Sequence, residues 1–428
     1  MINKEFSAGM GTLALALAAV LAGCNGGGGS TTSTPTSTIS GVVTGFGSVY
    51  VNGVEYNTDG ASISVDDVPG NDDYDLAVGM KVTLTGTVNA DGLTGSTSSI
   101  NYADELEGVV LANSVAADGT GTMNIMGQTV TLTLTTVFES HVPGIISVNG
   151  IASGNVVEVS GYSSGDGSVY ATRIEVKAPD LATYLANNPG SEMEVKGVVS
   201  GLDSASQTFA FGNLIVDYSA AMQVPSGLDD GLYVEVKSNT APVDNGDGTF
   251  TLAATRVEVE DDGIKGIHGD SGEEIELKGV ITNIDNLPAA FDLDGQTIQL
   301  VSETEFEDGL LSSALAVGDM VQVEGYFSAP DQLVAASVEP GEDDANLTEY
   351  KDYVQSVDAI NSTVTLQGGQ VITVTNTTIM QDSLDINAEH YFDLTDLHAG
   401  DYLEVYTYPD ASSNLVAAKL ERDDGPVI

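Results

Sequence analysis

Basic residues are scarce in this chain of 428 residues, which has 12 Lys and Arg against 63 Asp and Glu and a formal charge of −51. A surface this negative repels phosphate backbones, so the composition argues against a nucleic-acid partner. Tryptophan is absent, and there is one cysteine, Cys24. The chain can therefore form no intrachain disulfide and no cysteine-based zinc site.

Hydrophobic residues make up 42% of the chain, which is enough to build folded cores despite the charge. Only 18% of the residues are charged, so the acidity reflects a shortage of bases. Single cores rarely keep growing beyond roughly 250 residues, so a chain of this length predicts several domains.

The first 23 residues predict an export signal. Lys4 supplies a positive charge, and the apolar run from Met10 to Val20 is too short to span a bilayer. The run ends in Leu21-Ala22-Gly23-Cys24, which resembles the lipobox of bacterial lipoproteins. This resemblance implies that the chain is cut before Cys24 and that Cys24 is the lipid attachment residue. An ordinary secretory peptide with a stray cysteine is the alternative.

The residues after Cys24 predict a membrane anchor with a spacer. Several acyl chains on one residue would anchor the protein stably. Asn25 follows Cys24, and by resemblance to lipoprotein sorting the absence of Asp there favours the outer membrane, on its periplasmic or cell-surface face. Residues 24–38 are rich in Gly, Ser and Thr and predict a flexible tether.

One strand pattern recurs five times in the rest of the chain: a glycine, two residues, and then alternating apolar positions. Its copies are 79–84, 154–159, 231–236, 318–323 and 400–405. Alternation with a period of two is typical of a half-buried strand.

Two further patterns recur around this strand. Each unit opens with a strand that carries an early glycine (Gly41, Gly108, Gly197 and Gly279), replaced in the fifth unit by Asp352. Four units close with the pattern Ala-x-x-apolar-Glu, which ends in Glu175, Glu258, Glu339 and Glu421. We predict that this Glu points outward from the last strand and pairs with Arg173 or Arg256 where these are present. An outward ligand-binding role is the alternative.

The order of strands and turns predicts an all-β chain of five tandem small five-stranded, OB-like β-barrel modules, arranged as a string of beads. An SH3-like barrel and a small sandwich fit the same pattern. The predicted repeats are 39–104, 105–178, 191–262, 273–341 and 347–424, with linkers at 179–190 and 263–272. Asp180 to Leu185 predicts a capped helix that ends before Pro189-Gly190, and Leu310 to Leu315 predicts a short helix.

Three segments resemble a known family: Gly45 to Val54, Leu76 to Met80, and Gly127 to Val130. They are similar to the domain of unknown function 5666, which occurs in tandem in exported bacterial proteins. The resemblance covers residues from about 39 to 424. It implies β-barrel-like repeats and no established activity.

The sequence lacks the motifs that are typical of catalytic, phosphate-binding and metal-binding sites. The four histidines, His141, His268, His390 and His398, lack metal-binding spacing and predict surface or loop positions. The sequence contains no nucleophile elbow and no phosphate loop, so we predict no catalytic, cofactor-binding or metal-ligating residue and no cofactor. The acidic clusters at 71–75 and 244–248 do not match a calcium loop, and Asp247-Gly248 predicts a hairpin turn. Calcium remains a candidate partner, since so acidic a surface attracts divalent cations.

These features predict a non-enzymatic envelope or cell-surface lipoprotein that displays or binds a polysaccharide or protein partner through its repeats. One alternative is a carboxylate-dependent hydrolase of envelope polysaccharide, which predicts one repeat with a carboxylate-lined cleft that its siblings lack. Another is an acidic structural stalk stiffened by calcium.

Overall fold

The computed structural model describes residues 36–425, apart from 67, 164–166, 260–270, 294–295, 308, 330–331, 342–346, 385–391 and 411. The predicted signal peptide, Cys24, most of the predicted tether and most of the predicted linker 263–272 lie outside these residues. Within the described part, no helix is long and apolar enough to cross a bilayer.

The first repeat closes into a five-stranded barrel. Its strands are β1 (Ser37–Phe46), β2 (Val49–Val51), β3 (Val54–Asn57), β6 (Lys81–Val88) and β7 (Thr94–Tyr102). The first three form an antiparallel meander, β3 runs parallel to β7, and β6 lies antiparallel between β7 and β1. This closed Greek-key ring confirms the predicted OB-like barrel.

The same ring recurs through the described residues. The second repeat has β8 (Leu106–Asn113), β9 (Gly121–Ile125), β10 (Gln128–Leu132), β12 (Val156–Ser163) and β13 (Val169–Ala178). The fourth has β22 (Glu274–Asn283), β23 (Ala290–Leu293), β24 (Gln296–Gln299), β26 (Met320–Ala329) and β27 (Gln332–Pro340). The fifth has β28 (Thr348–Asp358), β29 (Thr363–Leu366), β30 (Val371–Thr373), β32 (Tyr402–Pro409) and β33 (Leu415–Asp423).

The third repeat follows the same order, but two of its strands are broken. Its first strand is split into β14 (Met193–Val198) and β15 (Ser200–Asp203), and its last into β20 (Phe250–Ala253) and β21 (Arg256–Val259). Between them lie β16 (Thr208–Phe211), β17 (Leu214–Asp217), β18 (Tyr233–Ser238) and the short β19 (Val243–Asp244). β14 and β21 pair with β18, whereas β15 joins the sheet of β16, β17, β20 and β19.

Four repeats carry an extra strand that runs parallel to the last strand of the barrel. These strands are β4 (Ser62–Val65), β11 (Val137–Ser140), β25 (Glu305–Phe306) and β31 (Ile379–Asp382), and β4 continues into a hairpin with β5 (Val68–Asn71). In the third repeat this strand shrinks to a single bridge between Gln223 and Arg256, because Pro225 has no backbone N–H to extend the ladder.

Two recurring glycines have physical reasons. The glycine that precedes the fourth strand of the barrel has a positive φ in every repeat; the values lie between 88° and 103° at Gly79, Gly154, Gly231, Gly318 and Gly400. The glycine of the first strand gives space to a neighbour, since a Cβ at Gly108 would lie 2.2 Å from the Met126 side chain. Asp352 replaces it in the fifth repeat, and its carboxylate accepts a hydrogen bond from the Gly368 N–H at 2.6 Å.

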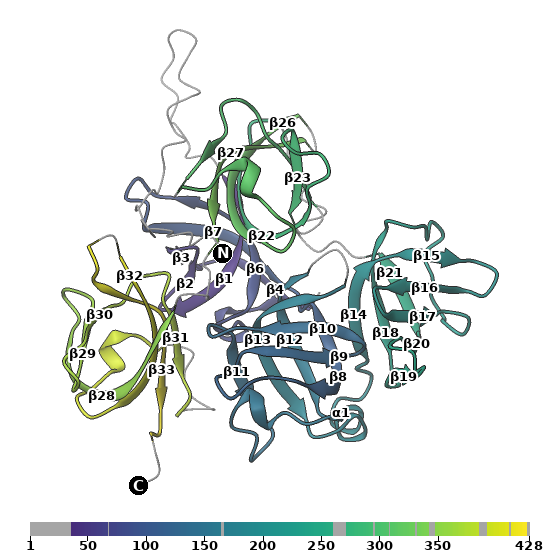
Figure 1. Ribbon diagram of the computed structural model, residues 1–428, viewed down its shortest axis with the longest axis horizontal. Coiled ribbons are helices and arrows are strands. Elements are labelled where there is room, and N and C mark those ends of the chain that lie inside the picture. Colours follow the sequence, from purple (N-terminus) through teal and green to yellow (C-terminus); the bar gives the residue numbers. More distant parts are fainter. Residues whose placement is uncertain are drawn as a thin grey trace, which may run out of the picture.

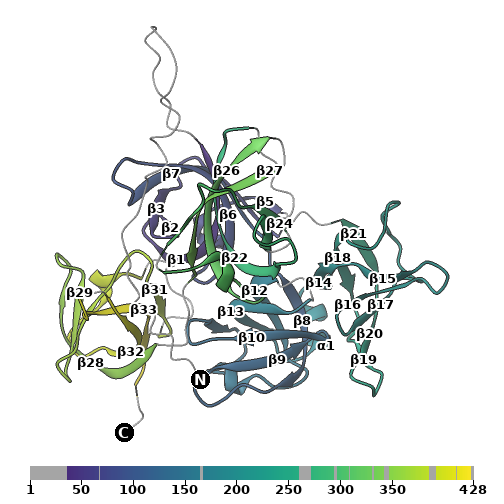
Figure 2. The ribbon, with the colours of Figure 1, turned by 45° about the horizontal axis from the view of Figure 1, so that its top comes forward.

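The barrels pack together, so the prediction of a string of separate beads is wrong. β1 pairs in parallel with β22 of the fourth repeat, and β8 pairs with β14 of the third. Figures 1 and 2 show the first repeat among the others and the third at one side. The predicted tether 24–38 is too long at its end, because Ser37 and Thr38 belong to β1, where they pair with Gly86 and Thr85 of β6.

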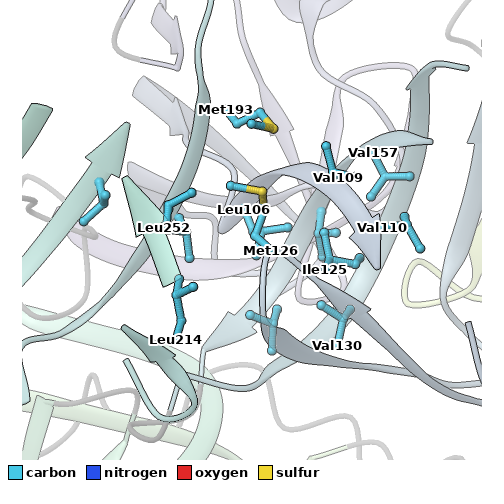
Figure 3. Close-up of a cluster of buried hydrophobic side chains, with 14 of the residues drawn as sticks. Leu106, Val109, Val110, Ile125, Met126, Val130, Val157, Met193, Leu214 and Leu252 are labelled. Carbon is cyan, nitrogen blue, oxygen red and sulfur yellow. The ribbon is translucent and has the colours of Figure 1, made fainter. Parts of the chain in front are cut away.

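The second and third repeats share one apolar core. Met126 of the second repeat lies in the same buried cluster as Leu214 and Leu252 of the third (Figure 3). The backbone of the second repeat lies close to the third repeat here: a Cβ added at Gly127 would lie 3.1 Å from the Leu214 side chain. The other three repeats each have a core cluster of their own.

Both predicted helices are confirmed. α1 (Leu181–Asn187) is capped by Asp180, which accepts a hydrogen bond from the Thr183 N–H at 2.8 Å. The helix does more than link two repeats: Tyr184 is buried, and its hydroxyl donates to Glu107 at 2.6 Å. The shorter element is a single 3₁₀ turn, Ser312–Ala314.

Candidate functional site

A polar row crosses the outside of each barrel. It consists of three residues that lie directly opposite one another on the first, fourth and fifth strands, and it includes the Glu that closes four of the units. The rows are Ser40–Thr83–Asn101, Glu107–Glu158–Glu175, Lys196–Glu235–Glu258, Lys278–Gln322–Glu339 and Lys351–Glu404–Glu421.

Directly opposed residues of antiparallel strands share one face of the sheet, so each row is a continuous strip of side chains. Its neighbours along the strands point the other way, and Val157 and Val159 beside Glu158 are fully buried in the core. Glu158 itself is 8% exposed, although it points away from its own barrel. The polar row of the second repeat is therefore covered by neighbouring repeats.

The row of the second repeat is neutralised by bases on its own strand. Glu175 forms ion pairs with Arg173 at 3.0 Å, as predicted, and with Lys177 at 3.0 Å. Lys177 also pairs with Glu158 at 2.8 Å. Burial by itself would raise the pKa of Glu175, but the hydrogen bond with His141 and the charges of Arg173 and Lys177 outweigh it and hold that pKa well below its usual value.

The prediction for Arg256 is wrong. Arg256 pairs with Glu192, at 2.6 Å, and not with Glu258. Glu258 instead accepts a hydrogen bond from the Gln223 side chain at 2.8 Å. In the second repeat, the residue opposite Glu175 on the parallel strand is Glu139, which also binds Arg173.

The rows of the second and third repeats meet at the seam between β8 and β14. Glu107 lies opposite Glu194 there, and Lys237 bridges Glu194 at 2.8 Å and Glu235 at 3.0 Å. Burial, with the charges of Glu158 and Glu194, raises the pKa of Glu107 to about 7 against the hydrogen bond from Tyr184.

The first repeat covers this seam with buried ionic contacts. Lys81 of β6 pairs with Glu105 at 3.2 Å, and both side chains are 8% exposed. Tyr102 donates its hydroxyl hydrogen to Glu158 at 2.9 Å. Lys196 of the third repeat donates to the Asp104 carbonyl at 2.6 Å. The three repeats therefore meet in one buried polar junction.

The fifth repeat is joined to the first two through polar side chains. Asn376 donates to the Gly53 carbonyl at 3.1 Å and accepts, at its own carbonyl, from Thr44 at 2.8 Å. Gln381 donates to the Phe138 carbonyl at 2.8 Å, and buried Lys419 donates to the Thr136 carbonyl at 3.3 Å.

The few bases of the chain are used in these contacts. All ten basic residues that the structure describes interact with other groups, at least nine of them in ion pairs with carboxylates. Sequence reasoning missed Lys81, Glu105 and Asp104. The scarcity of bases was the signal that could have found them. A buried carboxylate needs a partner of opposite charge, so the few bases of an acidic chain are expected at buried contacts.

A hollow of about 450 Å³ opens on the outside of the third repeat and includes two residues of its polar row. It is lined by Gln223, Val224, Pro225, Glu235, Val257, Glu258 and Val259. Val259 is 58% exposed. Burial, followed by the charge and hydrogen bond of Glu194, raises the pKa of Glu235 to about 8. The hollow lies where the extra parallel strand of the other repeats is reduced to one bridge.

Two of the four histidines, His141 and His398, lie in the described part of the chain, and they contact different groups. His141 is half-exposed and its Nε2 lies 2.9 Å from Glu175, a hydrogen bond that raises the pKa of His141. His398 lies on the surface, with Nδ1 2.9 Å from the Asp396 carbonyl. His268, His390 and Cys24, the predicted lipid attachment residue, lie outside the described residues.

Both acidic clusters form turns, as predicted for Asp247-Gly248. Asp72 caps a 3₁₀ turn, Asp73–Asp75, with a capping box. Asp244 and Asp247 accept hydrogen bonds from the backbone N–H groups of Gly246 and Thr249. Across the described residues, no three His, Cys, Asp or Glu side chains are grouped so that they could hold a metal ion.

These observations define an all-β repeat protein built of OB-like barrels. The family model named "Domain of unknown function (DUF5666)" matches residues 37–94, 107–175, 278–339 and 353–421. The four segments make up more than half of the chain, so the protein belongs to this family, as the sequence resemblance indicated. The matched residues leave out the third repeat, which has the broken strands and the hollow.

Comparison with curated proteins gives no match. Among solved structures, the chain is similar to "drosophila Unr CSD456" at 13% sequence identity, over 54% of this chain and 96% of that chain, with a TM-score of 0.13.

Proposed function

We propose that the protein is a non-enzymatic lipoprotein of the cell envelope, anchored through Cys24 in the outer membrane on its periplasmic or cell-surface face, whose barrels bind an external partner. The observation that carries this proposal is the hollow of the third repeat. It combines two carboxylates, Glu235 and Glu258, with exposed apolar surface at Val224 and Val259.

This combination suits a ligand that offers hydroxyl or amino donors on an apolar body. A polysaccharide has this chemistry, and OB-like barrels bind oligosaccharides. The formal charge of −51 disfavours nucleic acids and other polyanions. We therefore propose a neutral or cationic polysaccharide as the partner.

Binding is tested with the soluble form that begins after Cys24, on arrays of polysaccharides and proteins at moderate salt. The Val259→Asp variant should weaken polysaccharide binding at least tenfold. Val371→Asp is the matched control, because Val371 of the fifth repeat is 54% exposed, against 58% for Val259, and the change in charge is the same. Binding to proteins alone would contradict the polysaccharide proposal. The absence of binding on both arrays would contradict a binding function.

Anchoring is tested separately. Mass spectrometry of the mature N-terminus should find acyl chains on Cys24, and Cys24→Ala should release the protein from the membrane fraction. An unmodified Cys24 in the mature protein would contradict the lipoprotein assignment, whatever the barrels bind.

A hydrolase is the second candidate, and the same hollow supports it. Glu235 and Glu258 are directly opposed on β18 and β21. Such neighbours have Cβ atoms about 5 Å apart, so their carboxyl groups can reach the separation of about 5–5.5 Å that retaining glycosidases use. The raised pKa of Glu235 suits a general acid. This candidate requires that the purified protein release reducing ends from a bound polysaccharide and that Glu235→Gln abolish the release.

A further inference from the structure

The first strand of each barrel is shared between two partners. Its C-terminal half pairs with the second strand, and its N-terminal half pairs with the fourth, as in β1, where Val43–Phe46 faces β2 and Ser37–Val42 faces β6. The second strand does not reach the N-terminal half, so one side of this half is an open edge. We call it the docking edge.

Four docking edges are occupied, and each is occupied by another first strand of the same chain. The edge of β1 pairs with that of β22 from Ser37↔Glu274 to Ser40↔Leu277. The edge of β8 pairs with that of β14 at Leu106↔Val195 and Glu107↔Glu194. In both cases, two barrels are therefore joined by pairing between their first strands.

The docking edge of the fifth repeat is left over. The N-terminal half of β28, Thr348–Tyr353, pairs with β32 on one side, and within the described residues no other strand pairs with these six residues. At the end of this half, the Tyr353 carbonyl accepts a hydrogen bond from the Gln367 N–H at 2.9 Å. Thr348, Glu349 and Lys351 are exposed. An unpaired edge of this length offers backbone N–H and C=O groups to a further strand.

We propose that the docking edge of β28 pairs antiparallel with the same edge of a second copy of this protein, with Tyr350 at the two-fold axis. Two-fold symmetry brings one patch against itself, which antiparallel pairing of identical strands satisfies. A second copy supplies the one element that fills such edges elsewhere in the chain, another first strand.

Charge selects the register. With Tyr350 on the axis, Glu349 of each copy lies opposite Lys351 of the other, giving two cross-strand ion pairs. Centring the pair on Glu349 or on Lys351 would place like charges directly opposite each other. Within one copy Lys351 already contacts Glu349 at 2.9 Å and Glu404 at 3.1 Å, so the two outward charges are held on the edge.

Sedimentation velocity on the soluble form that begins after Cys24 tests the proposal. The wild type should sediment as a dimer that dissociates on dilution. Glu349→Lys and Lys351→Glu should each shift the protein to monomer, because each places like charges across the axis. The double variant Glu349→Lys/Lys351→Glu should restore the dimer, since it exchanges the charges and keeps them complementary.

The two single variants change the net charge in opposite directions, so loss of the dimer in both cannot come from general repulsion. The melting temperature of each variant reports folding, and in the double variant the lysine introduced by Glu349→Lys can still pair with Glu404. A wild type that is monomeric at every concentration, or a dimer that survives both single substitutions, would overturn the proposal. None of these outcomes depends on what the hollow of the third repeat binds.

Discussion

Lys81 of the first repeat and Glu105 at the start of the second form an ion pair of 3.2 Å with both side chains 8% exposed. Removing two charges from water is unfavourable unless each neutralises the other. The pair therefore ties the packing of the first two repeats to the presence of both partners.

Lys81→Met should leave the Glu105 carboxylate buried without its partner. We expect the free energy of unfolding to fall by about 3–5 kcal/mol, measured as a lower urea midpoint. Arg256→Met is the control, because Arg256 is 35% exposed in its pair with Glu192, and pairs near the surface contribute about 1 kcal/mol or less. Equal losses in both variants would show that burial of the pair is unimportant.

Gly79 and Gly154 occupy equivalent turns with similar φ, 89° and 99°, but different surroundings. A Cβ at Gly79 would lie 2.9 Å from Val137 of the second repeat, whereas nothing lies within 4 Å of one at Gly154. Gly154→Ala should lower the free energy of unfolding only by the cost of placing a Cβ on a left-handed backbone, about 1–2 kcal/mol. Gly79→Ala should lower the free energy of unfolding by about 1–3 kcal/mol more, because its Cβ also crowds Val137. This extra loss should appear as a larger drop in melting temperature. Identical drops would argue against close contact between the repeats.

Glu107 gives the stability a pH dependence. Its pKa is about 7 in the fold and 4.5 ordinarily, so the folded state binds more protons and the free energy of unfolding falls as pH rises between these values. Glu107→Gln keeps an acceptor for Tyr184 and removes this titration. We expect the loss of stability between pH 5 and pH 8 to shrink by about 1–3 kcal/mol.

Asp118→Asn serves as the control for this experiment. Asp118 lies in an exposed turn, where hydrogen bonds from the backbone and side chain of Thr120 lower its pKa. Its contribution changes only in more acidic solution, so it should leave the difference between pH 5 and pH 8 unchanged. The same difference in wild type and Glu107→Gln would mean that Glu107 is not responsible.

Salt should stabilise the protein. With 63 acidic residues and 12 bases, carboxylates outside the ion pairs repel one another. Raising sodium chloride from about 0.01 to 0.1 M shortens the screening length from about 30 to 10 Å, so the melting temperature should rise over this range. A flat or falling melting temperature would show that the buried ion pairs outweigh surface repulsion.

Much of the fold was predictable because its signals are local. Alternating apolar residues gave the strands, and the turn glycines proved to have positive φ. Asp180 marked the start of α1 because an N-cap acts within one turn of its helix.

The packing of the barrels was not predictable, since it depends on residues far apart in the chain. Nothing near Ser37 indicates that it will pair with Glu274. The closing Glu was predicted to point outward, and from its own barrel it does, but Glu175 is buried and contacts His141, Arg173 and Lys177. The hollow of the third repeat follows from the loss of a strand beside Pro225, which became visible only by comparison with the other barrels in three dimensions.

Cutting the chain between the third and fourth repeats tests most directly whether the barrels form one assembly. A protease site inserted after Gly263, in the soluble form, would give one fragment with the first three repeats and another with the last two. Pairing of β1 with β22 and of Asn376 with Gly53 predicts that the cleaved fragments stay together in size-exclusion chromatography without denaturant. Two fragments that elute separately would contradict the account.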